Sequence, residues 1–206
     1  MSTSKELNVI ICGVGGQGVV LMSELLGKAA IQDGLEVRGS EVLGMAQRGG
    51  SVQSNIRFGK GVYSPLTPEG KCDVLIALEP TEALRNINYL SESSIVILNS
   101  KKIVPYTVFL GMSRYPSLEE ILDKLSQATK RVVTLNAAQI AEEAGSLLAV
   151  NSVMVGALFA TGRVALNVET MKTVIHARFP FKVASDNIKA FELGYQSCVQ
   201  ALSRND

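Results

Sequence analysis

The sequence is poor in the residue types on which many enzymes depend. Its 206 residues include no tryptophan, one histidine, His176, and three cysteines, Cys12, Cys72 and Cys198. The cysteines are far apart and form no C-x-x-C pair, so we expect reduced thiols, and neither disulfides nor an iron–sulfur cluster. No histidine–cysteine cluster suits a metal ion, and His176 is predicted to be a helix-face residue, not a general base.

Charged side chains are also scarce. They make up 19% of the residues, whereas hydrophobic residues make up 47%. A typical soluble protein carries about 25% charged residues. The 20 basic and 19 acidic residues leave a net charge of +1, which predicts neither a nucleic-acid nor a membrane-surface partner. So few charges indicate instead that part of the surface faces another protein chain.

Long hydrophobic runs and common catalytic motifs are missing as well. No segment approaches the ~18 apolar residues of a membrane span, and the polar N-terminus MSTSKE is unlike a signal peptide. We therefore expect a cytoplasmic protein. Neither the G-x-S-x-G turn of hydrolases nor the G-x-x-x-x-G-K-[ST] phosphate loop occurs. The chain shows no evident nucleophile, acid, base or redox centre, so catalysis by this chain alone is not expected.

Two kinds of apolar segment alternate along the sequence. Continuous apolar runs predict strands buried on both faces of a parallel sheet, at 8–12, 72–78, 95–98 and 132–135. A further strand begins at 35–37, and the alternation over 51–58 predicts a half-buried strand. Helical spacing is found at 19–32, 80–90, 117–129, 137–143, 150–161, 169–177 and 185–202.

Strands that alternate with helices predict an α/β fold. We expect a Rossmann-like, doubly wound and mostly parallel sheet with a helical C-terminal part. The sequence contains no convincing linker or internal repeat, so residues 1–206 are expected to form a single domain whose C-terminal helices pack on the same core.

The strongest local signal is the glycine-rich turn at 13–18, G-V-G-G-Q-G, between a predicted strand and a predicted helix. It satisfies G-x-G-x-x-G in the required context. Glycines let a ligand approach the main chain, and the unpaired N–H groups of a helix start attract anions. The alternative is that the glycines serve only close strand–helix packing. The candidate ligand-binding residues here are Gly13, Gly15, Gly16, Gln17 and Gly18.

A second candidate site is the segment Q-R-G-G at 47–50. The forked cation of Arg48 and the backbone N–H groups of Gly49 and Gly50 suit a phosphate or a carboxylate. The alternative is a surface arginine in a flexible turn. Both glycine loops follow early strands, so they can converge at the sheet edge where open α/β sheets bind ligands.

Four further positions need an interpretation. Asn151 precedes an apolar helix and is interpreted mainly as its cap, with contact to a ligand or partner as the lesser possibility. A nicotinamide dinucleotide would need an acidic residue about 20 positions after the turn, and Glu36 and Glu41 are both near that place. A self-sufficient dehydrogenase and a non-catalytic binding module therefore remain as alternative functions. Arg57 is interpreted as structural.

Longer stretches carry a family resemblance. GVGGQGVVLMSELLGKAA at 13–30, GMAQRGGSVQSNIRFG at 44–59 and NSVMVGALFATG at 151–162 resemble the gamma-type domain of 2-oxoacid:ferredoxin oxidoreductases. Within that family, the beta subunits of indolepyruvate:ferredoxin oxidoreductases are similar at ALEPTEALRNINYL, VPYTVFLGMSRYPSLEEIL and NIKAFELGYQ. The resemblance covers nearly the whole chain.

The resemblance implies a subunit of an enzyme that oxidatively decarboxylates arylpyruvates with coenzyme A. The products would be aryl-acetyl-coenzyme A, carbon dioxide and reduced ferredoxin. It implies a hetero-oligomer in which a large alpha subunit carries thiamine diphosphate and iron–sulfur clusters. We expect Gly15–Gly18 and Arg48–Gly50 to line one pocket that holds the phosphates of coenzyme A and helps to close the thiamine site. A gamma subunit for another 2-oxoacid is the alternative within the family.

Overall fold

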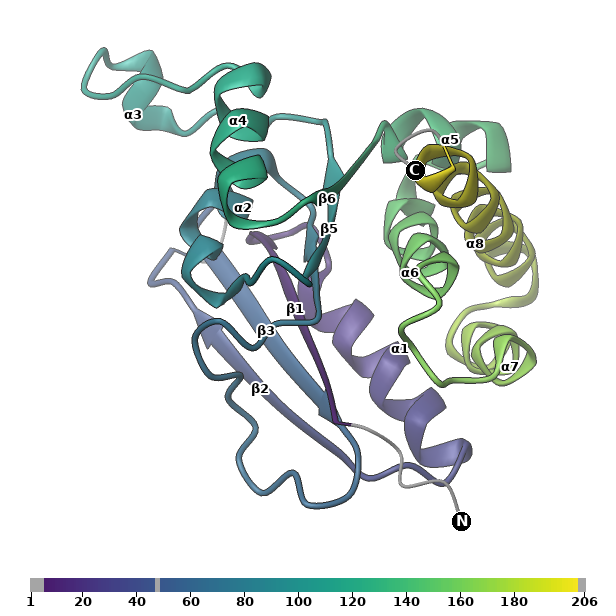
Figure 1. The fold of residues 1–206 in the computed structure, drawn as a ribbon. Helices are drawn as coiled ribbons and strands as arrows, with labels where there is room; N and C mark the ends of the chain where they lie inside the picture. Colours follow the sequence, from purple (N-terminus) through teal and green to yellow (C-terminus); the bar gives the residue numbers. More distant parts are fainter. Residues whose placement is uncertain (1–5, 47–48, 204–206) are drawn as a thin grey trace.

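Six strands form one mixed sheet in the order β2-β3-β1-β4-β5-β6 (Figure 1). The computed structural model describes residues 6–46 and 49–203. The strands are β1 (Leu7–Val14), β2 (Val37–Leu43), β3 (Ser51–Phe58), β4 (Val74–Ala77), β5 (Ile95–Asn99) and β6 (Arg131–Leu135). β1, β4, β5 and β6 are parallel, whereas β3 is antiparallel to both of its neighbours. The predicted α/β fold with a mostly parallel sheet is confirmed.

Side chains of the central strands alternate between two hydrophobic cores. Val9 and Ile11 of β1 belong to one core, and Ile10 and Cys12 belong to the other. β4 and β5 divide their side chains in the same way. Because both faces of these strands are covered, their sequences are continuously apolar instead of alternating.

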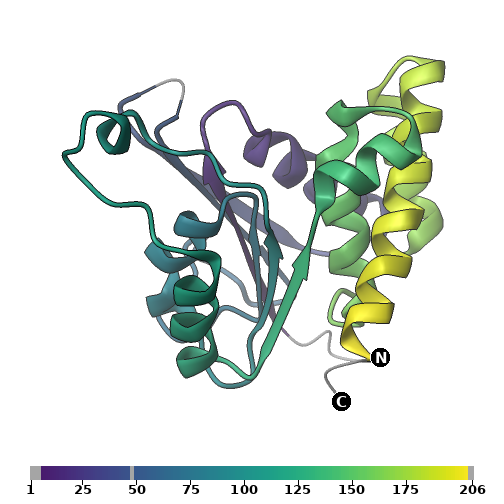
Figure 2. The same ribbon diagram turned by 90° about the horizontal axis from the view of Figure 1, so that it is seen from above.

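Helices cover both faces of the sheet (Figures 1 and 2). One face carries α1 (Val19–Gln32), α5 (Ala137–Ala144), α6 (Val150–Ala160), α7 (Val168–Arg178) and α8 (Phe181–Leu202). The other face carries α2 (Pro80–Arg85) and α4 (Leu118–Ala128). Two short 3-10 turns are η1 (Ile87–Tyr89) and η2 (Leu147–Ala149). The C-terminal helices share one core with α1, as predicted.

Local signals set several helix boundaries. Ser117 and Glu120 form the predicted capping box at the start of α4, each side chain accepting a bond from the other residue's N–H. Pro80 occupies the first turn of α2, where no N–H is needed. The helix predicted over 80–90 is interrupted, because α2 ends at Arg85 and η1 follows it.

The β2–β3 hairpin corrects one expectation. β3, which lies between β2 and β1, is not half-buried, since its last five residues are all buried. The loop over 59–72 covers its outer face, and Arg57 donates from Nη1 to the carbonyl oxygens of Ser64 (2.7 Å) and Leu66 (3.1 Å) in that loop. These bonds support the structural role predicted for Arg57.

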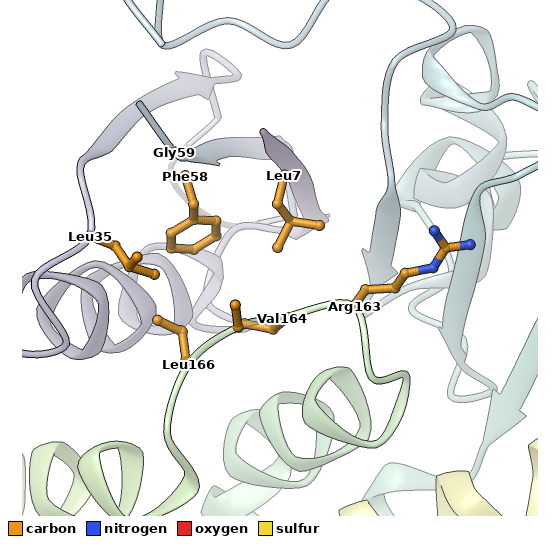
Figure 3. Close-up of a pocket in the computed structure, with 8 residues that line it drawn as sticks. Leu7, Leu35, Phe58, Gly59, Arg163, Val164 and Leu166 are labelled. Carbon is orange, nitrogen blue, oxygen red and sulfur yellow. The ribbon is translucent and has the colours of Figure 1, made fainter. Parts of the chain in front are cut away.

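The link between α6 and α7 fastens the C-terminal helices to the start of the sheet. Figure 3 shows Val164 and Leu166 of this link facing Leu35, Phe58 and Leu7. The cavity among these side chains has a volume of about 40 Å³. That is room for one or two water molecules and not for a substrate or cofactor.

Residues 100–117, between β5 and α4, form an excursion that we call the arm (Figures 1 and 2). It contains the one-turn helix α3 (Tyr106–Phe109), which buries none of its residues. The apolar periodicity of the sequence did not predict α3, because so short a turn has no repeating pattern. The arm extends beyond the C-terminal edge of the parallel strands.

Candidate functional site

The two glycine loops meet at the C-terminal end of β1. The N–H of Gly15 donates to the carbonyl oxygen of Gly50 (2.8 Å), and the N–H of Gly49 donates to the carbonyl oxygen of Gly15 (3.4 Å). They meet because β3 runs antiparallel to β1, with Val14 opposite Ser51. Gln47 and Arg48 lie outside the described residues, so the arginine expected at this site stays a prediction.

Gln17 holds the first turn together from inside. Its Oε1 accepts from the N–H of Val14 (2.8 Å), and its Nε2 donates to the carbonyl oxygen of Leu78 (2.9 Å). A Cβ at Gly13 would lie 2.8 Å from this Oε1, so a glycine leaves room for the side chain. Both ends of the Gln17 amide are engaged within the protein, so we assign it to building the turn. The backbone N–H groups of Val14, Gly15 and Gln17 are likewise used internally.

The remaining amides of the turn lead into an uncapped helix. Gly18 is the N-cap of α1 with a left-handed φ of 80°, and no side chain caps the helix. The first backbone bond of the helix is from Met22 to the oxygen of Gly18 (3.1 Å). The N–H groups that precede Met22 in α1 therefore lack a helical acceptor, and the positive end of the helix is available to an anion.

A cavity of about 470 Å³ lies beside this helix start, at the C-terminal ends of β4 and β5. Its lining residues are Gly16, Gln17, Gly18, Leu21, Leu78, Asn99, Lys101, Ile103, Leu147, Leu148, Val150 and Asn151. Among these described residues Lys101 is the one with a charge, and none is acidic. A cavity of this size suits a small molecule or part of a cofactor, and its charge favours an anionic group.

Asn151 is not a helix cap, which corrects the main expectation. α6 begins at Val150 and has Ala149 at its N-cap, so Asn151 lies inside the first turn. Its Nδ2 is 3.5 Å from the carbonyl oxygen of Gly18, a long contact, and its buried Oδ1 has no partner among the described residues. A Cβ at Gly18 would lie 2.0 Å from Nδ2. The asparagine thus packs directly against the glycine turn and lines the cavity.

Sequence patterns missed Asn99 and Lys101, although their positions hold a signal. Both follow the buried strand β5, and residues at the carboxyl ends of parallel strands line the ligand sites of open α/β sheets. Asn99 Nδ2 donates to the carbonyl oxygen of Leu78 (3.1 Å), the acceptor that Gln17 also uses. One carbonyl oxygen therefore links the glycine turn to the end of β5.

The other candidates lie elsewhere. Glu36 and Glu41 are exposed on the β2 side of the sheet, and β3 separates β2 from β1. Neither is therefore placed to serve a dinucleotide bound at the glycine turn, where the acidic residue ends the strand adjacent to β1. His176 is exposed on α7 and meets the ring of Phe181 edge-on, with centroids 6.1 Å apart, as predicted for a helix-face residue.

All three cysteines are buried and unpaired. Burial raises the pKa of Cys72 to about 12 and that of Cys198 to about 11, and it raises the pKa of Cys12 well above the ordinary thiol range. Thiolates, the reactive form, are therefore suppressed at neutral pH.

We expect the folded protein to resist thiol reagents. With Ellman's reagent at pH 8, all three thiols should react within minutes in guanidinium chloride, whereas the native protein should show less than one reactive thiol over the same time. Rapid reaction of a native cysteine would contradict the burial described above.

In the part of the chain that the structure describes, no helix has both the length and the apolar character needed to cross a membrane. Over the same residues, no three histidine, cysteine, aspartate or glutamate side chains come together in a way that could hold a metal ion.

Comparisons with known proteins identify the family. The model of the pyruvate ferredoxin/flavodoxin oxidoreductase family matches residues 8–197. Indolepyruvate oxidoreductase subunit IorB of Archaeoglobus fulgidus is 45% identical over 194 residues, which span 94% of this chain and 96% of that protein.

Solved structures give the same fold. The gamma subunit of a keto/oxoacid ferredoxin oxidoreductase from Geobacter sulfurreducens has a TM-score of 0.69 and 24% identity, covering 95% of this chain and 99% of that chain. The 2-oxoglutarate:ferredoxin oxidoreductase of Magnetococcus marinus has a TM-score of 0.74 and 20% identity, covering 95% of this chain but 31% of the longer chain. The protein described here therefore belongs to the pyruvate ferredoxin/flavodoxin oxidoreductase family, as a gamma-type subunit.

Proposed function

We propose that this chain is the small subunit of an indolepyruvate:ferredoxin oxidoreductase. The observation that carries the proposal is the 45% identity with IorB over almost the full length of both proteins. The complex oxidatively decarboxylates aryl 2-oxoacids with coenzyme A, and reduced ferredoxin is the electron product. The chain should co-purify with a large subunit, and only the mixture should reduce ferredoxin with indolepyruvate.

A panel of 2-oxoacids tests the substrate. Preference for pyruvate or 2-oxoisovalerate over arylpyruvates would favour a gamma subunit of another 2-oxoacid oxidoreductase. Turnover of any oxoacid by the purified small subunit alone would contradict the proposal.

The proposal divides the work between two chains. Thiamine diphosphate and iron–sulfur clusters, carried by the large subunit, supply the carbon and electron chemistry. The described residues of this chain do not suit an iron–sulfur cluster, because its thiols are buried and no ligand set for a metal is assembled. Its own part is to bind and to position.

We assign the phosphates of coenzyme A to the cavity beside the glycine turn. The proposal is supported by the uncapped start of α1, by Lys101 and by the absence of acidic side chains among the described lining residues. Gly16, where an added Cβ would meet open space, lets the ligand approach the main chain, while Gly13, Gly15 and Gln17 build the turn. Gly49 and Gly50 adjoin the turn through their hydrogen bonds with Gly15, and Arg48 remains a phosphate ligand predicted from the sequence.

Asn151 adds an acceptor to this proposed site. Its unpaired Oδ1 needs a hydrogen-bond donor, and a buried acceptor without one costs about 1–3 kcal/mol. Coenzyme A offers both the anionic phosphates that the helix start favours and amide N–H groups that can donate to such an acceptor.

Replacing Lys101 with alanine should raise the KM for coenzyme A about tenfold or more, with a smaller change in kcat. A charge-assisted hydrogen bond to a phosphate contributes about 1.5–3 kcal/mol, and about 1.4 kcal/mol corresponds to a factor of ten. The measurement is steady-state ferredoxin reduction by the complex at saturating indolepyruvate.

Lys60→Ala is the matched control. Lys60 is also an exposed lysine, but it follows β3 at the opposite edge of the sheet. An unchanged KM in both Lys101→Ala and Arg48→Ala, with the complex intact, would exclude this cavity as the coenzyme A phosphate site.

A further inference from the structure

The arm exposes large apolar side chains that nothing in the described chain covers. Tyr106, Phe109 and Met112 are 75%, 74% and 74% exposed, and Leu110 is more than half exposed. α3 buries no residue, so the hydrophobic effect within this chain does not stabilise its position. A cluster of this kind marks an interaction site in a soluble protein.

The arm nevertheless has a defined conformation. Glu79, fully buried after β4, accepts at Oε1 from the N–H of Ile103 (3.3 Å) and from the hydroxyl of Tyr115. Its Oε2 accepts from the N–H (2.7 Å) and the hydroxyl (2.6 Å) of Thr81 at the start of α2. One carboxylate thus ties both ends of the arm to the body.

Bonds within the arm close its tip. The N–H of Met112 donates to the carbonyl oxygen of Thr107 (2.9 Å), and the hydroxyl of Ser113 donates to that of Thr107 (2.9 Å). The exposed aromatic side chains are therefore presented on a preorganised loop, which lowers the entropy cost of binding.

The charge and position of the arm indicate what covers it. Between Ser100 and Ser117 the sequence has Lys101, Lys102 and Arg114 and no acidic residue, whereas the whole chain has a net charge of only +1. The arm also borders the 470 Å³ cavity, because Lys101 and Ile103 line that cavity. Whatever covers the arm is therefore brought to the rim of the proposed ligand site.

A longer protein of the same fold supports the view that a protein surface covers the arm. This chain corresponds to 31% of the Magnetococcus marinus chain, in which the same fold is part of a much longer polypeptide.

We propose that the arm docks the large subunit of the complex, whose matching surface is apolar and bordered by carboxylates. The inference rests on the proposed function, because it takes the large subunit as the partner. Aromatic side chains at the tip supply the buried contact, and Lys102 faces the acidic border.

The test is the affinity of this chain for the large subunit, measured by biolayer interferometry. Tyr106→Ser/Phe109→Ser should weaken binding at least tenfold, because exposed aromatic anchors dominate such interfaces. The matched control is Tyr63→Ser/Ile31→Ser, whose side chains are 91% and 66% exposed and lie outside the arm, after β3 and near the C-terminal end of α1. All four side chains are exposed, so both variants should fold, with unchanged circular dichroism and Tm.

Lys102→Glu should slow association with the large subunit and reduce its dependence on salt. Equal affinities of wild type and the arm variant would overturn the docking inference. The inference would also be overturned if the isolated chain formed a dimer and the Tyr106→Ser/Phe109→Ser variant did not. The arm would then bind a second copy of this chain. If wild type itself fails to bind the large subunit, the proposed function fails, a result distinct from either of these.

Discussion

Replacing Gly156 with alanine should lower the free energy of unfolding by about 3 kcal/mol or more. Gly156 lies in α6 where that helix crosses α8, and a Cβ there would be 1.9 Å from the carbonyl oxygen of Phe191. That atom belongs to the backbone of a long helix and cannot rotate away. The reciprocal contact exists as well, since a Cβ at Gly194 in α8 would be 2.1 Å from the oxygen of Val153.

The two glycines thus set the distance between α6 and α8. Overpacking a core costs about 1–3 kcal/mol and sometimes more, and here a whole helix must move. Separating the helices would also disturb the Phe159–Phe191 edge contact, with centroids at 5.2 Å, and the 2.6 Å hydrogen bond from Ser152 to Asn187. Chemical denaturation of purified wild type and variant measures the difference.

Gly27→Ala is the control for this experiment. Gly27 also lies inside a helix, α1, but the atom nearest to a Cβ added there would be Ile56 Cδ1, 3.9 Å away. Alanine is favoured over glycine in a helix by about 1 kcal/mol, so this variant should be neutral or stabilised. The contrary result is a free energy of unfolding of Gly156→Ala within about 1 kcal/mol of the wild-type value, which is the scale of that helix preference. Such a result would show that α6 and α8 do not cross as closely as described.

Replacing Arg57 with methionine should cost about 3 kcal/mol of stability. The buried guanidinium donates from Nε to Asn8 Oδ1 (2.7 Å), from Nη1 to two loop carbonyls and from Nη2 to Glu6. Methionine keeps much of the volume but leaves these acceptors without a donor, and each buried acceptor left unpaired costs about 1–3 kcal/mol. Tm should fall by roughly 6–12 °C.

Arg38→Met is the matched control for Arg57→Met. Arg38 is the register partner of Arg57 on β2, but its side chain is exposed and donates to the carbonyl oxygen of the adjacent Val37. Its removal should change the free energy of unfolding by less than about 0.5 kcal/mol. Equal effects of the two substitutions would show that the buried network does not stabilise the fold.

The loss in Arg57→Met should also depend on pH. The hydrogen bond from Arg57 lowers the pKa of Glu6, so the contribution of Glu6 is fully present above its ordinary pKa and is lost as the pH falls through the lowered value. The variant lacks this contribution throughout. The difference in unfolding free energy between wild type and variant should therefore narrow on acidification below the ordinary glutamate range.

The proposed site would bind its ligand largely through the main chain. The expected preference for an anion comes from N–H groups at the start of α1 and from one lysine, all at the C-terminal edge of the sheet. The arm borders the same edge, so a partner docked there would enclose the cavity. We therefore expect coenzyme A binding and assembly with the large subunit to depend on each other.

Local sequence determined the parts of this protein that need only neighbouring residues. Continuous apolar runs marked the central strands, the spacing of Ser117 and Glu120 fixed the start of α4, and the turn at 13–18 had the glycines that a strand-to-helix turn requires. Each of these signals acts over a few residues, through periodicity, capping or backbone freedom.

Only the tertiary structure decided which distant residues meet. The antiparallel insertion of β3 buried Arg57 and brought Gly50 to Gly15, and the path of α6 placed Asn151 against Gly18, 133 positions away. Lys101 reached the cavity because β5 ends there. Such contacts depend on strand order and on how helices cross the sheet, which are set by the packing of the whole core and leave no local pattern.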